Sequence, residues 1–283
     1  SKRDLRIAVG HDARISAPVL KKAVFEALTA AGCVTVDCGL ASTPAMFMST
    51  VFKATQMDGA IMITASHLPF NRNGLKFFTT EGGVEPKEIH EILESACHHP
   101  EVQGNLAKVQ KYDIMDRYCH FLRKKIRQAL GEEDAPLKGM HIVVDAGNGD
   151  GGFFATQILG RLGADTTGSR YLEPDGHFPN HIPNPENKQA MASIREAVLA
   201  SRADLGLIFD TDVDRMSAVL ENGKEISRNA LIAMMAAILA SDYPGSTIVT
   251  DSVTSDELTE FLTKELGLKH HRFKRGYKNV IDE

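Results

Sequence analysis

The stretch Leu205-Gly-Leu-Ile-Phe209-Asp210-Thr-Asp212-Val-Asp214-Arg215 joins an apolar run to three closely spaced carboxylates and a guanidinium. The apolar run predicts a buried strand, and extended alternation after it would place the three carboxylates on one side of the chain. Carboxylates so close together repel one another, and a bound divalent cation would relieve that repulsion. All-oxygen ligands suit Mg²⁺, and Arg215 suits a phosphate as the other partner of the metal. A solvated acidic turn is the alternative interpretation.

A second informative stretch is Ile61-Met-Ile-Thr64-Ala-Ser66-His67-Leu-Pro69, followed by Asn73-Gly-Leu-Lys76. It predicts an apolar strand that ends at a hydroxyl nucleophile beside an imidazole, with an ammonium group after a glycine turn. Serine can carry a phosphoryl group where a metal and a nearby cation offset the charge. No G-x-S-x-G elbow surrounds Ser66, which argues against a Ser-His-Asp hydrolase.

Together the two stretches resemble the α-D-phosphohexomutase family, which comprises phosphoglucomutases, phosphomannomutases and phosphoglucosamine mutases. The family's T-A-S-H-N-P loop, N-G-x-K segment and D-G-D-G-D-R loop are matched by Thr64–Pro69, Asn73–Lys76 and Asp210–Arg215. Two more segments are similar to family motifs. Gly10-His-Asp12-Ala-Arg14-Ile-Ser16 matches G-x-D-x-R-x-S, and Pro174-Asp-Gly-His-Phe-Pro179 with Pro183-Asn-Pro-Glu186 matches P-D-G-x-F-P and P-N-P-E.

The resemblance implies an enzyme that interconverts hexose 1-phosphate and hexose 6-phosphate through a phosphoserine and a bisphosphorylated sugar. Ser66 would carry the phosphoryl group, with a hexose 1,6-bisphosphate as activator. Mg²⁺ would be held by the Ser66 phosphate and by Asp210, Asp212 and Asp214. The other implied catalytic residues are Arg14 and Arg215 on the phosphoryl group, and Lys76 and His67 as acid/base candidates. We expect Lys76 to point into a cleft, where desolvation would lower its pKa.

Departures from the family pattern bear on activity. Thr211 and Val213 replace the two glycines of the acidic loop, and Leu68 replaces the usual asparagine after Ser-His. Because β-branched residues avoid positive φ, the loop must be either β-like or distorted. These changes leave open a non-catalytic protein of the same fold that acts within a larger assembly.

The C-terminal stretch Lys274-Arg275-Gly-Tyr277-Lys278 resembles the family's phosphosugar-contacting loop, so Arg275, Tyr277 and Lys278 are expected to bind substrate. The family's later sugar-specificity loop and fourth domain have no counterpart in these residues. We therefore expect a missing C-terminal part of the same protein, without which this chain would be weak or inactive. Glucose, mannose and glucosamine phosphates remain equally possible substrates.

Alternating strand and helix patterns predict an α/β fold of successive parallel-rich βαβ units of phosphohexomutase type, with the fourth domain absent. A linker of glycine, charge and proline at residues 131–136 suggests the first boundary. We predict domains at 1–133, 134–226 and 227–283, the last incomplete. Expected helices include residues 153–162 and 255–266.

Composition narrows the class of partner. The 283 residues carry a formal net charge of -5 and are 43% hydrophobic, which argues for a globular protein and against nucleic acid as partner. No apolar run approaches the roughly 20 residues that cross a bilayer, so no membrane insertion is expected. The four cysteines lack metal-like spacing, which suggests free thiols in a reducing compartment, the cytoplasm or an organelle stroma.

A rival hypothesis comes from Gly147-Asn-Gly149-Asp150-Gly-Gly152, which satisfies G-x-G-x-x-G after a strand, with Asp165 further on. This pattern is typical of dinucleotide-binding oxidoreductases. It would leave the serine and acidic loops unexplained. The preferred interpretation assigns these glycines to tight turn geometry and close packing.

Overall fold

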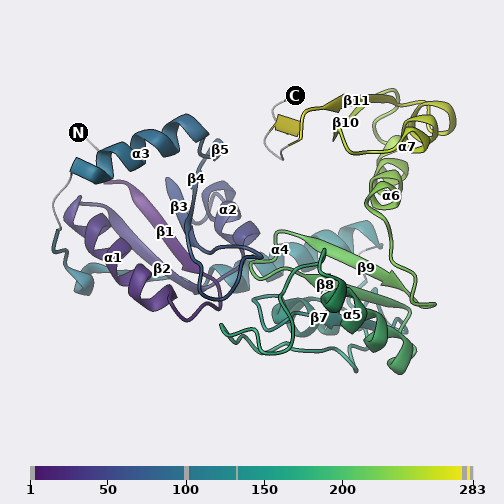
Figure 1. Cartoon of the computed structure of the whole chain (residues 1–283), viewed down its shortest axis with the longest axis horizontal. Coiled ribbons are helices and arrows are strands. Elements are labelled where there is room, and N and C mark those ends of the chain that lie inside the picture. Colours follow the sequence, from purple (N-terminus) through teal and green to yellow (C-terminus); the bar gives the residue numbers. More distant parts are fainter. Residues whose placement is uncertain (1–3, 99–101, 132, 276–278, 281–282) are drawn as a thin grey trace. The chain divides into compact units, whose positions relative to one another are not determined.

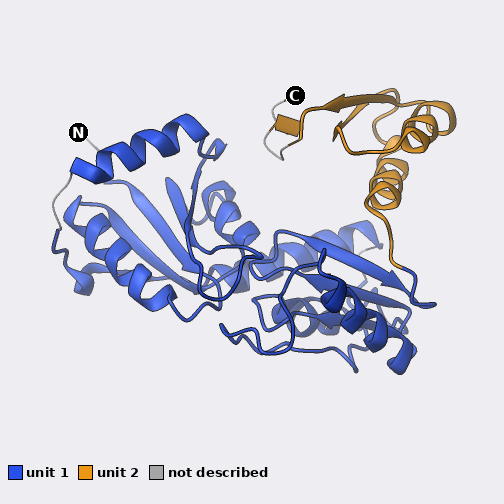
Figure 2. Ribbon diagram, in the orientation of Figure 1, with its two compact units in different colours: residues 1–224 blue, residues 225–283 orange. Residues whose placement is uncertain are grey.

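The computed structural model describes all residues except 1–3, 99–101, 132, 276–278 and 281–282 (Figure 1). The chain divides into two compact units, residues 1–224 and residues 225–283 (Figure 2). The first unit contains a six-stranded and a three-stranded sheet, and the second unit contains a two-stranded sheet. This organisation confirms the α/β class and its parallel-rich character.

The six-stranded sheet has the order β5-β4-β3-β1-β2-β6. Strands β1, β2 and β3 run parallel, whereas β3 and β4 form an antiparallel pair. The bounds are β1 Arg6–His11, β2 Val34–Leu40, β3 Gly59–Ile63, β4 Leu75–Thr79, β5 Gly82–Gly83 and β6 Gln110–Lys111. The alternating pattern predicted the parallel strands but not β4, β5 or β6. Because β4 returns beside β3, the Ser66 stretch becomes the connection between two paired strands.

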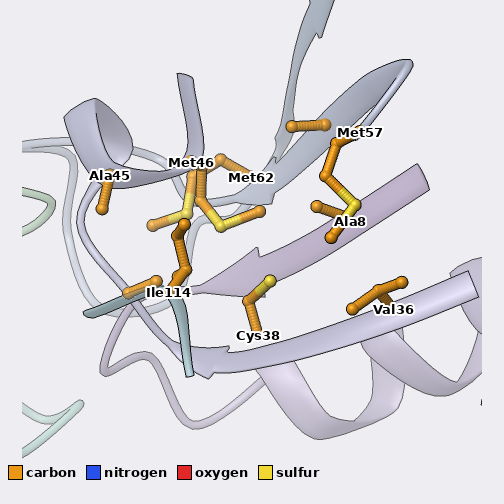
Figure 3. Close-up of a cluster of buried hydrophobic side chains, with 10 residues drawn as sticks. Ala8, Val36, Cys38, Ala45, Met46, Met57, Met62 and Ile114 are labelled. Atoms are coloured by element: carbon orange, nitrogen blue, oxygen red, sulfur yellow. The ribbon is translucent and has the colours of Figure 1, made fainter. Parts of the chain in front are cut away.

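Helices cover both faces of this sheet. Neighbouring residues of a strand point to opposite faces, and those of the central strand β1 are buried on both. Ala8 packs in a cluster with Met46 and Ile114 (Figure 3), whereas Val9 packs in a second cluster with Phe25. The helices are α1 Ala17–Ala30, α2 Thr43–Val51, α3 Pro86–His98, α4 Ile114–Ala129 and the 3₁₀ turn η1 Leu106–Lys108. Each fully buried aliphatic side chain stabilises the fold by about 1.5–3 kcal/mol.

The three-stranded sheet has the order β7-β8-β9, with β7 (Ile142–Asp145) parallel and β9 (Met216–Leu220) antiparallel to β8 (Leu205–Phe209). Helix α5 (Lys188–Ser201) packs its apolar side on this sheet. The expected helix 153–162 is instead a π-helical segment, η2 (Phe154–Leu159), and a 3₁₀ turn, η3 (Gly160–Leu162). Gly163, at φ 95°, ends it in a conformation that favours glycine.

The second unit contains α6 (Arg228–Ala240), the parallel strands β10 (Thr247–Asp251) and β11 (Lys269–Phe273), and α7 (Asp256–Glu260). The Ser255 side chain caps α7 by accepting from the Leu258 amide, as Ser, Thr and Asp commonly do. The expected helix 255–266 changes to the π-helical segment η4 (Phe261–Glu265) halfway. Leu258 and Leu262 form its small core with Ala236 and Leu268.

The predicted boundaries at 133/134 and 226/227 remain predictions, although the two sheets of the first unit lie on either side of the first boundary. Among the described residues, no helix has both the length and the apolar character needed to span a bilayer.

Candidate active site

Ser66 lies in a tightly bonded connection between β3 and β4. Its φ is 51°, a left-handed conformation that is uncommon outside glycine. The Ser66 amide donates to the Thr64 hydroxyl at 2.9 Å, and that hydroxyl donates to Asp12 Oδ2 at 2.7 Å. The Thr64 amide donates to the Gly74 carbonyl at 3.0 Å, which closes the loop. These bonds hold the strained serine in one orientation.

Arg14 holds the same loop in place through its guanidinium group. It is 1% exposed, and its Nε donates to Asp12 Oδ2 at 3.0 Å. Its four remaining N–H groups donate to backbone carbonyls of the serine loop, those of Ser66, Leu68, Pro69 and Arg72. All five donors of the guanidinium therefore bind the chain itself. The expected contact of Arg14 with a phosphoryl group stays a prediction, and it would require one of these five hydrogen bonds to be exchanged.

The acidic loop follows β8, and its three carboxylates converge. One oxygen from each of Asp210, Asp212 and Asp214 lies within 4.8 Å of the others. Asp210 Oδ1 accepts from the amides of Asp214 and Arg215 at 3.1 and 3.0 Å, which curls the loop around that carboxylate. Val213 has φ 63°. The β-like alternative is therefore wrong at Val213, and the loop is distorted.

Ser66 meets this loop through two hydrogen bonds. Its hydroxyl donates to Asp210 Oδ2 at 3.0 Å and accepts from Arg215 Nη2 at 2.6 Å. The same Nη2 contacts His67 Nδ1, so the imidazole accepts there and is neutral. Burial and the Arg215 charge both lower the pKa of His67. Ser66, His67, Arg215 and Asp210 thus form one connected group.

Burial, which is the largest cause, and the charges of Asp212 and Asp214 together raise the pKa of Asp210 to about 8. A carboxyl in this environment gains strongly from a cation. Asp212 Oδ1 is buried and has no hydrogen-bond partner. An all-oxygen donor set with an unsatisfied carboxylate oxygen fits a hard divalent cation such as Mg²⁺, so the residues present fit the metal that the sequence implied.

Lys76 is paired with the acidic loop. Its Nζ lies 2.7 Å from Asp212 Oδ2 and 2.8 Å from Asp214 Oδ2, with the lysine side chain 31% exposed. Burial alone would lower its pKa, but the charges of Asp212 and Asp214 outweigh burial and raise it. The expectation of a lowered pKa is therefore wrong in this state, because desolvation was considered without the two facing carboxylates.

Thr43 holds Asp212 of the acidic loop in place, and the sequence analysis did not identify it. Its amide donates to the Asp212 carbonyl at 2.8 Å, and its hydroxyl bonds Asp212 Oδ2. Thr43 opens α2, with Ser42 as the capping residue and Pro44 next. The Ser-Thr-Pro cap is visible in the sequence as a helix start, but nothing in it indicates a partner 169 residues away.

Residues 174–186 pack against the loop that carries Arg14. A Cβ on Gly176 would lie 2.4 Å from the Ala13 carbonyl oxygen, so only glycine fits this approach. The Phe178 ring lies 5.4 Å from the Arg14 guanidinium carbon, within the range of a cation–π contact. The P-D-G-x-F-P segment thus packs against the residues that hold the serine loop.

His181 anchors this segment and was also missed. Its Nε2 lies 3.0 Å from Asp145 Oδ1, and its Nδ1 lies 3.0 Å from the Ile182 carbonyl. Both partners are acceptors, so both ring nitrogens must donate and the ring is an imidazolium. Burial opposes this charge, but Asp145 outweighs burial and raises the pKa of His181.

The glycines of the G-x-G-x-x-G pattern face protein, not an open turn. A Cβ on Gly149 would lie 2.8 Å from the Thr211 backbone, and one on Gly152 would lie 2.0 Å from the Leu172 carbonyl oxygen. Asp165 accepts from the Thr167 amide at 2.9 Å. Close packing therefore accounts for these glycines, as the preferred interpretation expected.

Asp150, within the same turn, is 5% exposed, and neither of its carboxylate oxygens makes a hydrogen bond. Burial raises its pKa well above the ordinary value, and the nearby Asp12 and Asp212 charges add to that effect. Of the expected substrate contacts in the second unit, Arg275 is exposed. Tyr277 and Lys278 lie outside the described residues.

The chain matches two family models. Residues 1–102 match domain I of phosphoglucomutase/phosphomannomutase, and residues 116–223 match domain II. It is 33% identical over 247 residues to the phosphomannomutase/phosphoglucomutase of Pseudomonas aeruginosa, covering 87% of this chain and 50% of that protein. It is 31% identical over 280 residues to a probable phosphoglucosamine mutase of Methanopyrus kandleri, covering 97% of this chain and 59% of that protein.

Among solved structures, a phosphoglucomutase/phosphomannomutase family protein from Burkholderia thailandensis is similar, with a TM-score of 0.84 and 26% identity. The match covers 98% of this chain and 59% of that one. A pair of α/β sheets whose serine and acidic loops meet defines the class of protein. The chain belongs to the α-D-phosphohexomutase family, of phosphoglucomutase/phosphomannomutase type. It spans about half the length of the P. aeruginosa relative.

Proposed function

We propose that this chain carries the phosphoserine and metal-binding part of a phosphohexomutase, which interconverts hexose 1-phosphate and hexose 6-phosphate. The observation that carries the proposal is the Ser66 hydroxyl, held between Asp210 Oδ2 at 3.0 Å and Arg215 Nη2 at 2.6 Å. A hydroxyl between a carboxylate of a divalent-cation site and a guanidinium is placed for phosphoryl transfer. The family membership supports the same reaction class.

In the proposed reaction, Ser66 rests as a phosphoserine. A free hydroxyl of the sugar phosphate attacks the phosphorus, the bond between phosphorus and Ser66 Oγ breaks, and a bisphosphorylated sugar forms. After the sugar reorients, Ser66 Oγ attacks its other phosphoryl group, the bond between that phosphorus and the sugar oxygen breaks, and the monophosphate product leaves with the phosphoserine restored. A hexose 1,6-bisphosphate would load the serine and so act as activator.

The residues of the site divide this work. Arg215, whose side chain is 37% exposed, offers N–H groups to the charge that develops on the transferring group. Arg14 acts as a positioning residue, since it holds the serine loop through four carbonyls. Neutral His67 and protonated Lys76 are the groups available to accept and to supply the transferred proton.

Asp210, Asp212 and Asp214 would hold Mg²⁺ together with an oxygen of the Ser66 phosphate. Bound there, the cation would neutralise charge on the phosphoryl oxygens. Glucose, mannose and glucosamine phosphates remain candidates as substrates. Arg275, Tyr277 and Lys278 are proposed as contacts to the sugar phosphate.

Phosphopeptide mapping after incubation with glucose 1,6-bisphosphate and Mg²⁺ tests the assignment. We expect one phosphate, on Ser66, and none in Ser66→Ala. The matched control is Ser16→Ala, since Ser16 also lies next to the serine loop and its hydroxyl accepts from Asn73 Nδ2 at 2.9 Å. Phosphate on another residue, or phosphate that persists in Ser66→Ala, would refute the proposal.

A further inference from the structure

The position of the Lys76 side chain has a consequence for metal binding. Its ammonium nitrogen lies 2.7 Å from Asp212 Oδ2 and 2.8 Å from Asp214 Oδ2. These two carboxylates belong to the group of three whose oxygens lie within 4.8 Å of one another. A single nitrogen therefore bridges two of the three carboxylates that would ligate a cation.

The third carboxylate of the group is not bound by Lys76. Asp210 Oδ2 accepts from the Ser66 hydroxyl at 3.0 Å and lies 3.4 Å from Arg215 Nε. Arg215 Nε also lies 3.6 Å from Asp214 Oδ1, so it pairs with Asp210 and Asp214 at longer distances than those of Lys76. Among the described cationic side chains, Lys76 makes the two shortest contacts with the group, and it alone pairs with Asp212.

We propose that the Lys76 ammonium occupies the cation position of the acidic loop in the metal-free protein, and that Mg²⁺ must displace it to bind. This inference rests on the proposed function in taking the three carboxylates as the metal site. A carboxylate oxygen that donates its lone pairs to both an ammonium group and Mg²⁺ would bring two cations within contact distance, which their mutual repulsion opposes.

Displacement serves two purposes. In the absence of metal, the ammonium offsets the repulsion within the loop, so the carboxylates stay converged and ready. When metal enters, the lysine side chain is released from Asp212 and Asp214 toward the exposed side of the site. Lys76 then becomes available to substrate only in the loaded enzyme, which couples metal binding to the position of a proposed proton donor.

Mg²⁺ titration by calorimetry tests the inference on wild type, Lys76→Met and Lys21→Met, all without phosphate on Ser66. Lys21 is a matched control, because it is a part-buried lysine that pairs with Asp37 at 3.2 Å, away from the acidic loop. We expect the Mg²⁺ dissociation constant of Lys76→Met to fall at least about tenfold, since no ammonium has to be displaced. Tenfold corresponds to about 1.4 kcal/mol, close to the lower end for one charge-assisted hydrogen bond. Lys21→Met should bind as wild type does.

A second measurement needs no variant and separates displacement from simple charge repulsion. Reductive methylation of wild type, read residue by residue by mass spectrometry, should proceed several-fold faster at Lys76 when Mg²⁺ is added. Lys21 should react at the same rate with and without the metal. A lysine that repels Mg²⁺ without leaving its carboxylates would show no change in labelling.

The outcomes are distinct. Tighter binding in Lys76→Met together with faster labelling of Lys76 supports displacement. Equal or weaker binding in a folded Lys76→Met, or unchanged labelling in Mg²⁺-bound wild type, overturns it while leaving the metal site intact. Absence of Mg²⁺ binding in wild type and both variants overturns the metal site itself, and with it the proposed function.

Discussion

Replacing Val213 by glycine should stabilise the protein, although the change removes the whole isopropyl side chain. Val213 has φ 63°, where the Cβ of an L-residue crowds the following carbonyl oxygen at a cost of about 1–2 kcal/mol. Glycine avoids that cost but loses about 0.5–1 kcal/mol more backbone entropy on folding. The side chain is only half-buried, so little packing is lost. The net expectation is about 0.5–1 kcal/mol of stabilisation.

Scanning calorimetry on metal-free protein measures this change. For a unit of this size, about 1 kcal/mol corresponds to about 2–4 °C in Tm, so we expect a rise of about 1–4 °C. Val213→Ala is the control, because it removes the same two methyl groups but keeps the Cβ that causes the strain. If Val213→Gly lowers Tm, or if Val213→Ala raises it equally, backbone strain at this position is not the cause.

Three further predictions concern the site. Arg14→Lys can replace at most three of the five hydrogen bonds that Arg14 donates. We expect the free energy of unfolding to fall by about 3 kcal/mol or more and hydrogen exchange in residues 66–72 to become faster. The control Arg72→Lys, at an exposed position, should behave as wild type. The folded-state pKa of Asp210 is raised to about 8, so its contribution to the stability of the metal-free protein should be largest below pH 4 and should be lost as pH rises toward 8. Mg²⁺ should reverse that loss in wild type but not in the double variant Asp212→Asn with Asp214→Asn. A Tm that does not depend on pH would contradict the prediction. Gly152→Ala would place a Cβ 2.0 Å from the Leu172 carbonyl oxygen, so we expect it to lower the free energy of unfolding by about 1–3 kcal/mol. The control Gly160→Ala should lower it less. Unchanged stability of Gly152→Ala with altered NAD binding would favour the dinucleotide hypothesis.

The strands that carry the site could be predicted from the sequence, because apolar runs that end in polar motifs are local signals. The runs before Ser66 and before Asp210 are β3 and β8 in the structure. Strand β4 was missed because the residues after the Asn73-Gly74 turn were assigned no strand, and the pairing of β4 with β3 cannot be seen from a local pattern. The π-helical segments were missed because their apolar spacing resembles that of an α-helix over so few residues.

Within the site, residue types could be predicted but their partners could not. The acidic loop, Ser66 and Arg215 came from motifs whose chemistry is visible in one dimension. Lys76 was assigned a lowered pKa because its environment was inferred from neighbours in the chain, whereas Asp212, 136 residues away, decides it. Arg14 shows the same limit, since its donors are used by carbonyls that no side-chain pattern indicates.

The acidic loop contacts residues that are far away in the sequence. Ser66 and Asp210 are 144 positions apart, and Thr43 of α2 and Asp212 are 169 apart. Chain segments so distant meet late, because their loop-closure entropy must be overcome before any contact between them is gained. We expect each sheet to form before the site does, so these contacts would be absent from the transition state of folding. Interactions of that kind slow unfolding with little effect on the folding rate. The contacts around Ser66 and Asp210, proposed for phosphoryl transfer, would then also set the unfolding rate of the protein.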